Sequence, residues 1–171
     1  ISKERASSLA KTINFRKATS PDALNPDSIF QESENTTHYS IIDKYGNVVS
    51  NTYTLGYSFG SGVTIPGTGI LLDNQMNNFA YQHGNPEVID RSASIGNRFE
   101  PGKRPMSTMT PIIVFDENNE LKLITGSPGG SLIPAAVLRV VTGVIDFNLN
   151  LGEATMLPRL HKDWPYKSLS L

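Results

Sequence analysis

The chain has 171 residues, which is the length of one domain of ordinary size and enough to bury an apolar core. Its 15 basic and 16 acidic residues give a net charge of -1, which argues against partners recognised by bulk charge, such as nucleic acid or an anionic membrane. Cysteine is absent, which excludes disulfides, thiolate nucleophiles and cysteine zinc sites, and no run of about 18 apolar residues could span a bilayer.

The start of the chain shows apolar residues at helical spacing. They recur on one face from Ala6 to Ile13, which predicts a helix over residues 1–18 with Ser2 as a candidate cap. Residues 19–35 are rich in Ser, Pro, Asp, Asn and Glu and lack an apolar period, so we expect an exposed connector that self-cleavage can reach. Because the first residue is not Met, we expect this chain to be a piece of a longer product.

Two β-hairpins are predicted from strand-like runs separated by turn residues. Residues 38–43 alternate well enough for a strand, the run 43–47 supplies turn residues, and residues 48–55 are rich in Val, Thr and Tyr. Residues 111–126 repeat this pattern around an acidic and amide-rich turn at 116–119. We therefore expect antiparallel strands in both regions.

The region between the hairpins has little periodicity. A glycine-rich loop at residues 60–69 leads to a short apolar strand at 70–72 and then to a polar stretch at 73–78. Residues 81–103 show neither the helical nor the strand period and contain several Gly and Pro. A loop of this length inside a compact domain is usually a functional lid or is disordered.

The last third of the chain predicts two helices. The turn at residues 126–130 leads into an apolar segment at 131–147, with Ser131 as the expected cap and Pro134 early enough to be tolerated. This helix is apolar nearly all round, so we expect it to be buried. A capping box at residues 150–153 opens a short final helix. The order of elements favours a layered α+β fold over a regular parallel repeat.

Several short motifs carry little chemistry. His38, His83 and His161 are far apart and lack metal-ligand spacing, so no zinc site is predicted. The segment Gly126–Gly130 has its serine in the wrong place for a nucleophile elbow and lacks the lysine of a phosphate-binding loop. We interpret it as a turn.

The threonine pair Thr36-Thr37 offers a different kind of site. A threonine hydroxyl is a poor nucleophile, and cutting the chain before it provides its own α-amine as the base. That amine has an ordinary pKa of about 7.7–8.0, so a useful fraction is neutral near physiological pH. The alternative is that both threonines simply begin a strand, where Thr is common.

Longer motifs bear on this choice. The segment ENTTHYSIIDKYGNVVSNTYTL resembles the processing site and first two strands of the small subunit of γ-glutamyltranspeptidases, which are N-terminal-nucleophile hydrolases. GILLDNQMNNF, KRPMSTMTPIIV, ITGSPGGSLI and NLGEATMLPRLH continue the resemblance in the same order and at similar spacing. It implies an α+β, four-layer αββα fold, present as a fragment. Residues 1–35 would be the end of the large subunit, with its processing connector, and residues 36–171 the small-subunit catalytic domain, truncated at its C-terminus.

The resemblance also implies catalytic residues. The precursor would cut itself between Asn35 and Thr36, and the freed Thr36 would attack the γ-glutamyl amide. Thr54 matches the second threonine, whose hydroxyl orients the nucleophile. Gly129 and Gly130 match the oxyanion hole, in which backbone N–H groups meet the developing negative charge.

Substrate-binding residues follow by the same resemblance. Ser107 and Thr108 match the pair that holds the substrate's α-carboxylate, and Gln75 matches a glutamine near its α-amino group. Asn78 stands where the family usually has an aspartate for the α-ammonium, and Gly56 stands where it usually has an asparagine. Because a charged partner binds an ammonium more strongly than a neutral amide, we expect weakened recognition of the amine.

The implied activity is transfer or hydrolysis of γ-glutamyl groups from glutathione-like amides through an acyl-Thr36 ester. Water, an amino acid or a peptide would be the acceptor, and residues 81–97 would form a lid. The large subunit of the same precursor would be the partner, with no metal or cofactor, in a periplasmic or secreted location. Two alternatives stay open: a hydrolase of glutaryl amides like the cephalosporin acylases, and a catalytically inactive, unprocessed paralog or fragment.

Overall fold

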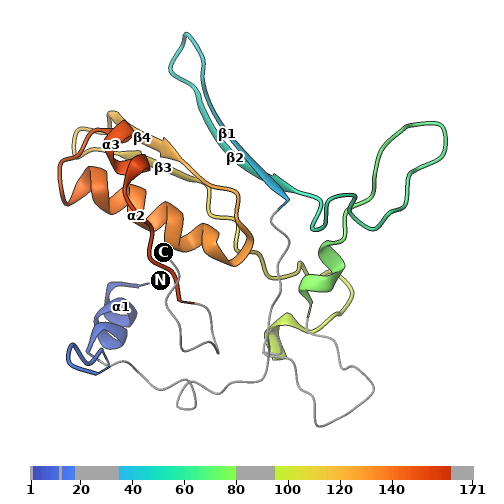
Figure 1. Ribbon diagram of the computed structural model, residues 1–171, viewed down its shortest axis with the longest axis horizontal. Coiled ribbons are helices and arrows are strands. Elements are labelled where there is room, and N and C mark those ends of the chain that lie inside the picture. Colours follow the sequence, from blue (N-terminus) through green and yellow to red (C-terminus); the bar gives the residue numbers. More distant parts are fainter. Residues whose placement is uncertain (1, 12, 18–34, 80–94, 163–171) are drawn as a thin grey trace.

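The computed structural model describes residues 2–11, 13–17, 35–79 and 95–162. Within these ranges, one long hairpin, a second hairpin and a pair of packed helices lie together, and a looped arm extends away from them (Figure 1). Most of the predicted connector lies outside the described residues, since only its last residue, Asn35, is described. Most of the predicted lid also lies outside them. Across the described part of the chain, the helices fall short of the length and apolar character needed to cross a bilayer.

The N-terminal helix is confirmed but is shorter than expected. Helix α1 spans Lys3–Ala10, and the hydroxyl of Ser2 accepts a hydrogen bond from the N–H of Arg5 at 3.2 Å, as the predicted cap should. Beyond the helix, the side-chain oxygen of Asn14 accepts bonds from the N–H groups of Arg16 and Lys17. Such local bonds compete with helical ones, so the helix does not continue through residues 14–17 as expected.

The first predicted hairpin is confirmed. Strands β1 (Thr36–Ile42) and β2 (Val48–Thr54) are antiparallel. Asp43 organises the turn between them, because its Oδ1 accepts from the N–H of Asn47 at 2.9 Å and its Oδ2 accepts from the Asn47 side chain at 2.7 Å. These bonds stabilise the carboxylate and lower the pKa of Asp43. Gly46 completes the turn at a φ of 85°, a conformation that glycine adopts without strain.

The second hairpin repeats this arrangement. Strands β3 (Ile112–Phe115) and β4 (Leu121–Thr125) are antiparallel, with an irregular register near the turn. Asp116 accepts from the N–H of Glu120 at 2.9 Å, and Asn119 takes the left-handed position at a φ of 66°. Asn tolerates that conformation better than most residues, so the turn residues specify both hairpins.

Side chains join the two hairpins and the helices. The hydroxyl of Ser50 donates to the carbonyl of Thr125 at 3.1 Å, and β4 contacts β1, β2 and the helix α2 (Ile133–Ile145). Helix α3 (Leu151–Met156) packs on α2. The buried apolar residues of this part are Leu123, Ile133, Ala136, Val137, Val140 and Ala154. Helices α2 and α3 therefore lie against the second hairpin, whereas the first hairpin projects away from them (Figure 1).

Helix α2 differs from two expectations. Ser131 does not cap it: residues Gly130–Leu132 form a 3-10 turn, and Leu132 occupies the cap position without a side-chain hydrogen bond. The predicted burial all round is also wrong, because α2 packs with one face while Leu138 on another is 63% exposed. Pro134 lies in the first turn, as predicted. The predicted capping box of α3 is confirmed in both of its hydrogen bonds.

The expected strand at residues 70–72 is wrong. This segment folds back on residues 61–65 through one isolated bridge, Thr64 to Leu71, and forms the extended arm of Figure 1. Gly60 explains the tight start of the arm, since an added Cβ would overlap the carbonyl oxygen of Leu72. Glycines with positive φ along the arm bend the backbone away from a regular strand.

Candidate active site

The register of β1 and β2 sets the position of the predicted nucleophile. Thr36 lies opposite Thr54, so the first residue of one strand faces the last residue of the other. Both threonines are half-buried, whereas Thr37 is exposed, as the alternation of a strand requires. The structure therefore brings together the two threonines that the resemblance selects.

The hydroxyl of Thr54 contacts the bond predicted to be cut. In this uncleaved chain it donates to the carbonyl oxygen of Asn35 at 3.1 Å and accepts from the N–H of Gly56 at 3.0 Å. A hydroxyl that receives one hydrogen bond donates the next more strongly. A donor at this oxygen stabilises the negative charge that forms if the Asn35 carbonyl is attacked.

His38 packs against the segment that carries the predicted oxyanion hole. Its ring nitrogens contact the hydroxyls of Thr52 at 2.9 Å and Ser40 at 3.1 Å, and burial lowers its pKa. A Cβ added to Gly126 would overlap the ring, so the absence of a side chain there permits the contact. No local sequence pattern indicates this pairing, since His38 lies in β1 and Gly126 follows β4.

The glycine pair at the start of α2 has the backbone expected of a tight turn. Gly129 has a φ of 129° and Gly130 a φ of 55°, and Gly130 is buried. Both values disfavour residues with a side chain. The pair lies at the N-terminal end of the helical segment, where backbone N–H groups lack helical partners and favour negative charge. The predicted role as oxyanion hole stays a prediction.

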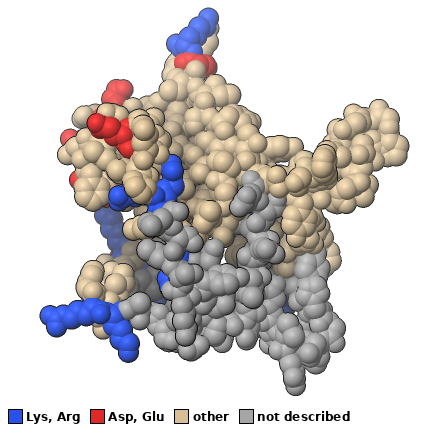
Figure 2. All heavy atoms as spheres, viewed as in Figure 1, with Lys and Arg blue, Asp and Glu red and all other residues tan. Residues whose placement is uncertain are grey.

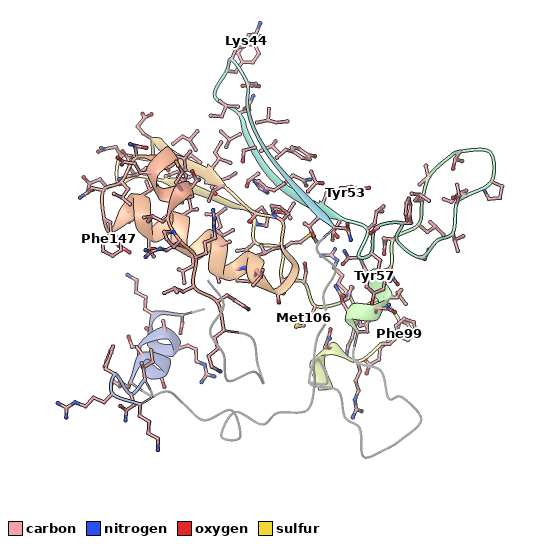
Figure 3. All side chains as sticks on the ribbon, in the orientation of Figure 1. Lys44, Tyr53, Tyr57, Phe99, Met106 and Phe147 are labelled. Atoms are coloured by element: carbon pink, nitrogen blue, oxygen red, sulfur yellow. The ribbon has the colours of Figure 1, made fainter. Side chains whose placement is uncertain are left out.

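The predicted amine-binding residues lie on the 3-10 helix η2 (Gln75–Asn78). Gln75 Nε2 donates to the carbonyl of Thr54 at 3.5 Å, which links this helix to the nucleophile hairpin. Asn78 Nδ2 donates to Gln75 Oε1 at 3.4 Å and to the carbonyl of Met106 at 3.3 Å. Figure 3 shows Met106 next to η2. Hydrogen bonds thus connect Thr54 to the residue that precedes the predicted carboxylate-binding pair.

That pair, Ser107 and Thr108, lies in an irregular segment before β3. The hydroxyl of Ser107 accepts from the N–H of Met109 at 3.1 Å, and the carbonyl of Thr108 accepts from Thr110 at 2.7 Å. The bond to Met109 uses an acceptor lone pair of Ser107 and leaves its O–H hydrogen able to donate to a carboxylate. Figure 2 shows that the described charged side chains on this face gather towards the helices and the tip of the first hairpin.

The structure adds features that the sequence did not reveal. Gly56 has a φ of 85°, and an added Cβ would lie 3.1 Å from the Cβ of Asn74, so a side chain would be strained there. Asn97, within the helix η3 (Ile95–Asn97), is 8% exposed and bonds to both Asn78 and Met106. It lies in the aperiodic stretch after the first hairpin, where no pattern distinguished it. No set of three metal-ligating residues occurs within the described ranges.

Comparisons with known proteins identify the family of the chain. A family model described as gamma-glutamyltranspeptidase matches residues 1–171. The glutathione hydrolase proenzyme of Escherichia coli (strain K12) is 44% identical over 163 residues, which are 95% of this chain and 28% of that protein. The chain therefore spans less than a third of that relative's length.

Two solved structures are similar to this chain. One is an acivicin-inhibited γ-glutamyltranspeptidase whose C-terminus has critical roles in autoprocessing and catalysis, and the other is a mutant γ-glutamyltranspeptidase from Helicobacter pylori. Each is 46% identical to this chain with a TM-score of 0.68, and each match covers 78% of this chain. The match covers 70% of the acivicin-inhibited chain and 71% of the Helicobacter pylori chain.

Proposed function

This chain belongs to the γ-glutamyltranspeptidase family, and we propose that cleavage of its Asn35–Thr36 bond makes Thr36 the nucleophile of an enzyme acting on γ-glutamyl amides. The observation that carries the proposal is the hydrogen bond from the Thr54 hydroxyl to the Asn35 carbonyl. The fold itself is the predicted α+β N-terminal-nucleophile fold, represented in part by this chain.

Self-cleavage would begin at the carbonyl that Thr54 contacts. Thr36 Oγ attacks the carbonyl carbon of Asn35, and Thr54 stabilises the charge on the oxygen. The C–N bond breaks, the hydroxyl proton passes to the departing nitrogen, and an ester links Asn35 to Thr36 Oγ. Water then hydrolyses this ester, which restores the hydroxyl and leaves Thr36 with a free α-amine.

Turnover would use that amine as the base. Near physiological pH a useful fraction of an α-amine is neutral, so it can take the proton of Thr36 Oγ as the oxygen attacks the γ-carbonyl. The N–H groups of Gly129 and Gly130 would stabilise the resulting oxyanion. The released amine leaves an acyl-Thr36 ester, which water hydrolyses or an amino acid or peptide accepts.

Recognition of the γ-glutamyl group would involve two sets of residues. Ser107 and Thr108 would hold the α-carboxylate, while Gln75 and Asn78 would face the α-ammonium. The side-chain Nδ2 of Asn78 donates to Gln75 and Met106, so its side-chain oxygen Oδ1 is the group suited to accept from an ammonium. Glutathione and related amides are therefore the proposed donors.

A second candidate activity is hydrolysis of glutaryl amides, which lack the α-amine. The neutral Asn78 and the absent side chain at Gly56 favour it. A hydrogen bond to a charged group contributes about 1.5–3 kcal/mol, and one between neutral groups about 0.5–1.5 kcal/mol. An amide partner therefore discriminates less strongly for the amine than a carboxylate partner would.

Kinetics with paired substrates test the proposal. The full-length gene product is assayed with γ-glutamyl and glutaryl anilides of the same leaving group. Turnover of the γ-glutamyl anilide supports the main proposal, and a strong preference for it removes the second candidate. Turnover of neither substrate, with the Asn35–Thr36 bond intact, would support an inactive paralog.

Residues 1–35 are proposed to end the large subunit and residues 36–171 to form most of the small one, so the two halves of the precursor remain partners after cleavage. A periplasmic or secreted location is proposed from family resemblance alone. Fractionation of the source cells, with a cytoplasmic marker protein as control, tests that location.

A further inference from the structure

The side chain of Asn97 joins the two predicted recognition segments. Its Nδ2 donates to the backbone carbonyl of Asn78 at 2.8 Å, and its Oδ1 accepts from the backbone N–H of Met106 at 3.0 Å. One amide therefore bridges the end of η2 and the residue directly before Ser107. Both of its polar atoms are used.

The surroundings make these bonds strong. Asn97 is 8% exposed, and Phe79, which follows η2, is 2% exposed and packs edge-on against Phe99 at 5.4 Å between ring centroids. Figure 3 shows Phe99 and Met106 next to η2. Hydrogen bonds in an apolar environment are stronger than those in water, and an unpaired polar atom there is costly. The bridge should therefore resist opening.

Met106 is held from both sides. Its N–H donates to Asn97 and its carbonyl accepts from Asn78 Nδ2 at 3.3 Å. Together with the bond between Asn97 and Asn78, these contacts close a ring of three residues. The ring determines how far the amine-side residues lie from the carboxylate-side residues.

The proposed substrate needs that separation to be constant. Its α-ammonium and α-carboxylate are attached to the same carbon, so the two recognition segments must present their groups at one spacing. Holding groups at a set geometry lowers the cost of binding, because less freedom is lost when the ligand arrives.

We infer that Asn97 is a positioning residue that aligns the α-amine and α-carboxylate subsites for two-point recognition of the substrate's α-carbon. The inference rests on the proposed function for its substrate class. Asn97 itself does not touch the substrate. It acts through the backbone of Asn78 and Met106.

The test compares a ligand that has both the α-amine and the α-carboxylate with a ligand that lacks the amine. Binding of L-glutamate, which has both α groups, and of glutarate, which lacks the amine, is measured by calorimetry on the processed full-length protein. The variant is Asn97→Leu, which has similar volume but no hydrogen bonds. Asn77→Leu is the matched control, since Asn77 is an exposed amide in η2, next to Asn78 but outside the bridge.

We expect Asn97→Leu to weaken glutamate binding about tenfold relative to glutarate, because misaligned subsites lose about one hydrogen bond's worth of contact to the α-ammonium. Asn77→Leu should leave the ratio of the two dissociation constants unchanged. A purely structural role would reduce the active fraction without changing that ratio. If Asn97→Leu does not fold, Asn97→Ser, which is too short to bridge both groups, provides the same comparison.

An unchanged ratio in a folded Asn97 variant overturns the inference, and so does a wild-type protein that binds both ligands equally. Failure of the proposed function is a separate outcome. It would be seen as an absence of turnover with γ-glutamyl anilide in the wild type, whereas the binding ratio depends on no catalytic step.

Discussion

The two halves of the site are built in different ways. Thr36 and Thr54 are placed by the register of a regular hairpin, in which backbone bonds set each position. Gln75, Asn78 and Met106 lie in irregular segments that side-chain amides tie together. Both halves meet at Thr54, whose hydroxyl contacts Asn35 and whose carbonyl accepts from Gln75.

This difference indicates which changes each half should tolerate. Strand register is supported by many backbone hydrogen bonds. A single substitution there should remove a reactive side chain without shifting the pairing of the strands. The irregular half depends on a few side-chain bonds, so a single substitution there should alter substrate preference. Substitutions of the catalytic residues should therefore lower the rate, whereas substitutions of the recognition residues should change substrate specificity.

The largest effect is expected at the nucleophile. Thr36→Ala removes the attacking oxygen, so both self-cleavage and turnover should be lost. Electrophoresis of the full-length product and an anilide assay measure the two effects. Thr37→Ala is the control, because Thr37 is exposed on the opposite face of β1 and should retain both. Cleavage in Thr36→Ala would show that another residue attacks.

The next effect is expected at Thr54. Thr54→Val keeps the shape but removes the donor to the Asn35 carbonyl, and loss of one such donor slows a reaction by about 10²–10³-fold. The rate of appearance of the two cleavage fragments measures it. Thr54→Ser keeps the hydroxyl and should restore most of the rate. Equal rates in the Val and Ser variants would contradict the role.

A packing change should perturb the link between the hairpins. In Gly126→Ala the new methyl group overlaps the His38 ring, and overpacking of this kind costs about 1–3 kcal/mol. We expect a lower Tm and a lower kcat, because the segment leading to Gly129 is displaced. Adding His38→Ala removes the ring and should recover the Tm in part. Independent, additive losses in the double variant would show that the contact is not the cause.

A smaller effect, a gain in preference for γ-glutamyl substrates and not a loss of activity, is expected at Asn78. Asn78→Asp supplies a charged partner for the α-ammonium, so the ratio of kcat/KM for γ-glutamyl over glutaryl anilide should rise about tenfold. Asn77→Asp adds the same charge one residue away on an exposed side chain and is the control. An equal rise in both variants would mean that general electrostatics, and not this position, sets the preference.

The smallest effect is a pH dependence of stability. Burial lowers the pKa of His38 in the folded chain, so the unfolded chain takes up a proton first as the pH falls. Stability should therefore decline as the pH falls below about 6.5, the ordinary value for His, and level off below the folded value. Comparing Tm against pH for the wild type and His38→Gln isolates this contribution. Identical profiles would exclude it.

Local chemistry accounts for what the sequence predicts well. Asp43 and Asp116 each accept backbone hydrogen bonds within a turn, and such turns determine both hairpins without distant contacts. The capping box at Asn150 and Glu153 is equally local. These features can be recognised because their partners lie within four residues.

Long-range packing accounts for what the sequence missed. Leu138 looks like a core residue in an apolar helix, yet nothing in the local pattern shows which face packs on β4. The contact between His38 and Gly126 and the bridge made by Asn97 depend on segments brought together only in the folded chain. The catalytic residues themselves were selected by family resemblance, and their roles stay predictions.

The proposed activity requires that the Asn35–Thr36 bond be broken, because only then does Thr36 have a free α-amine to act as the base. Mass spectrometry and N-terminal sequencing of the purified full-length gene product detect this cleavage. We predict a separate chain that begins Thr36-Thr37-His38 with a free α-amine. A product that stays continuous across Asn35–Thr36 while turning over γ-glutamyl anilide would show that the enzyme does not need this amine.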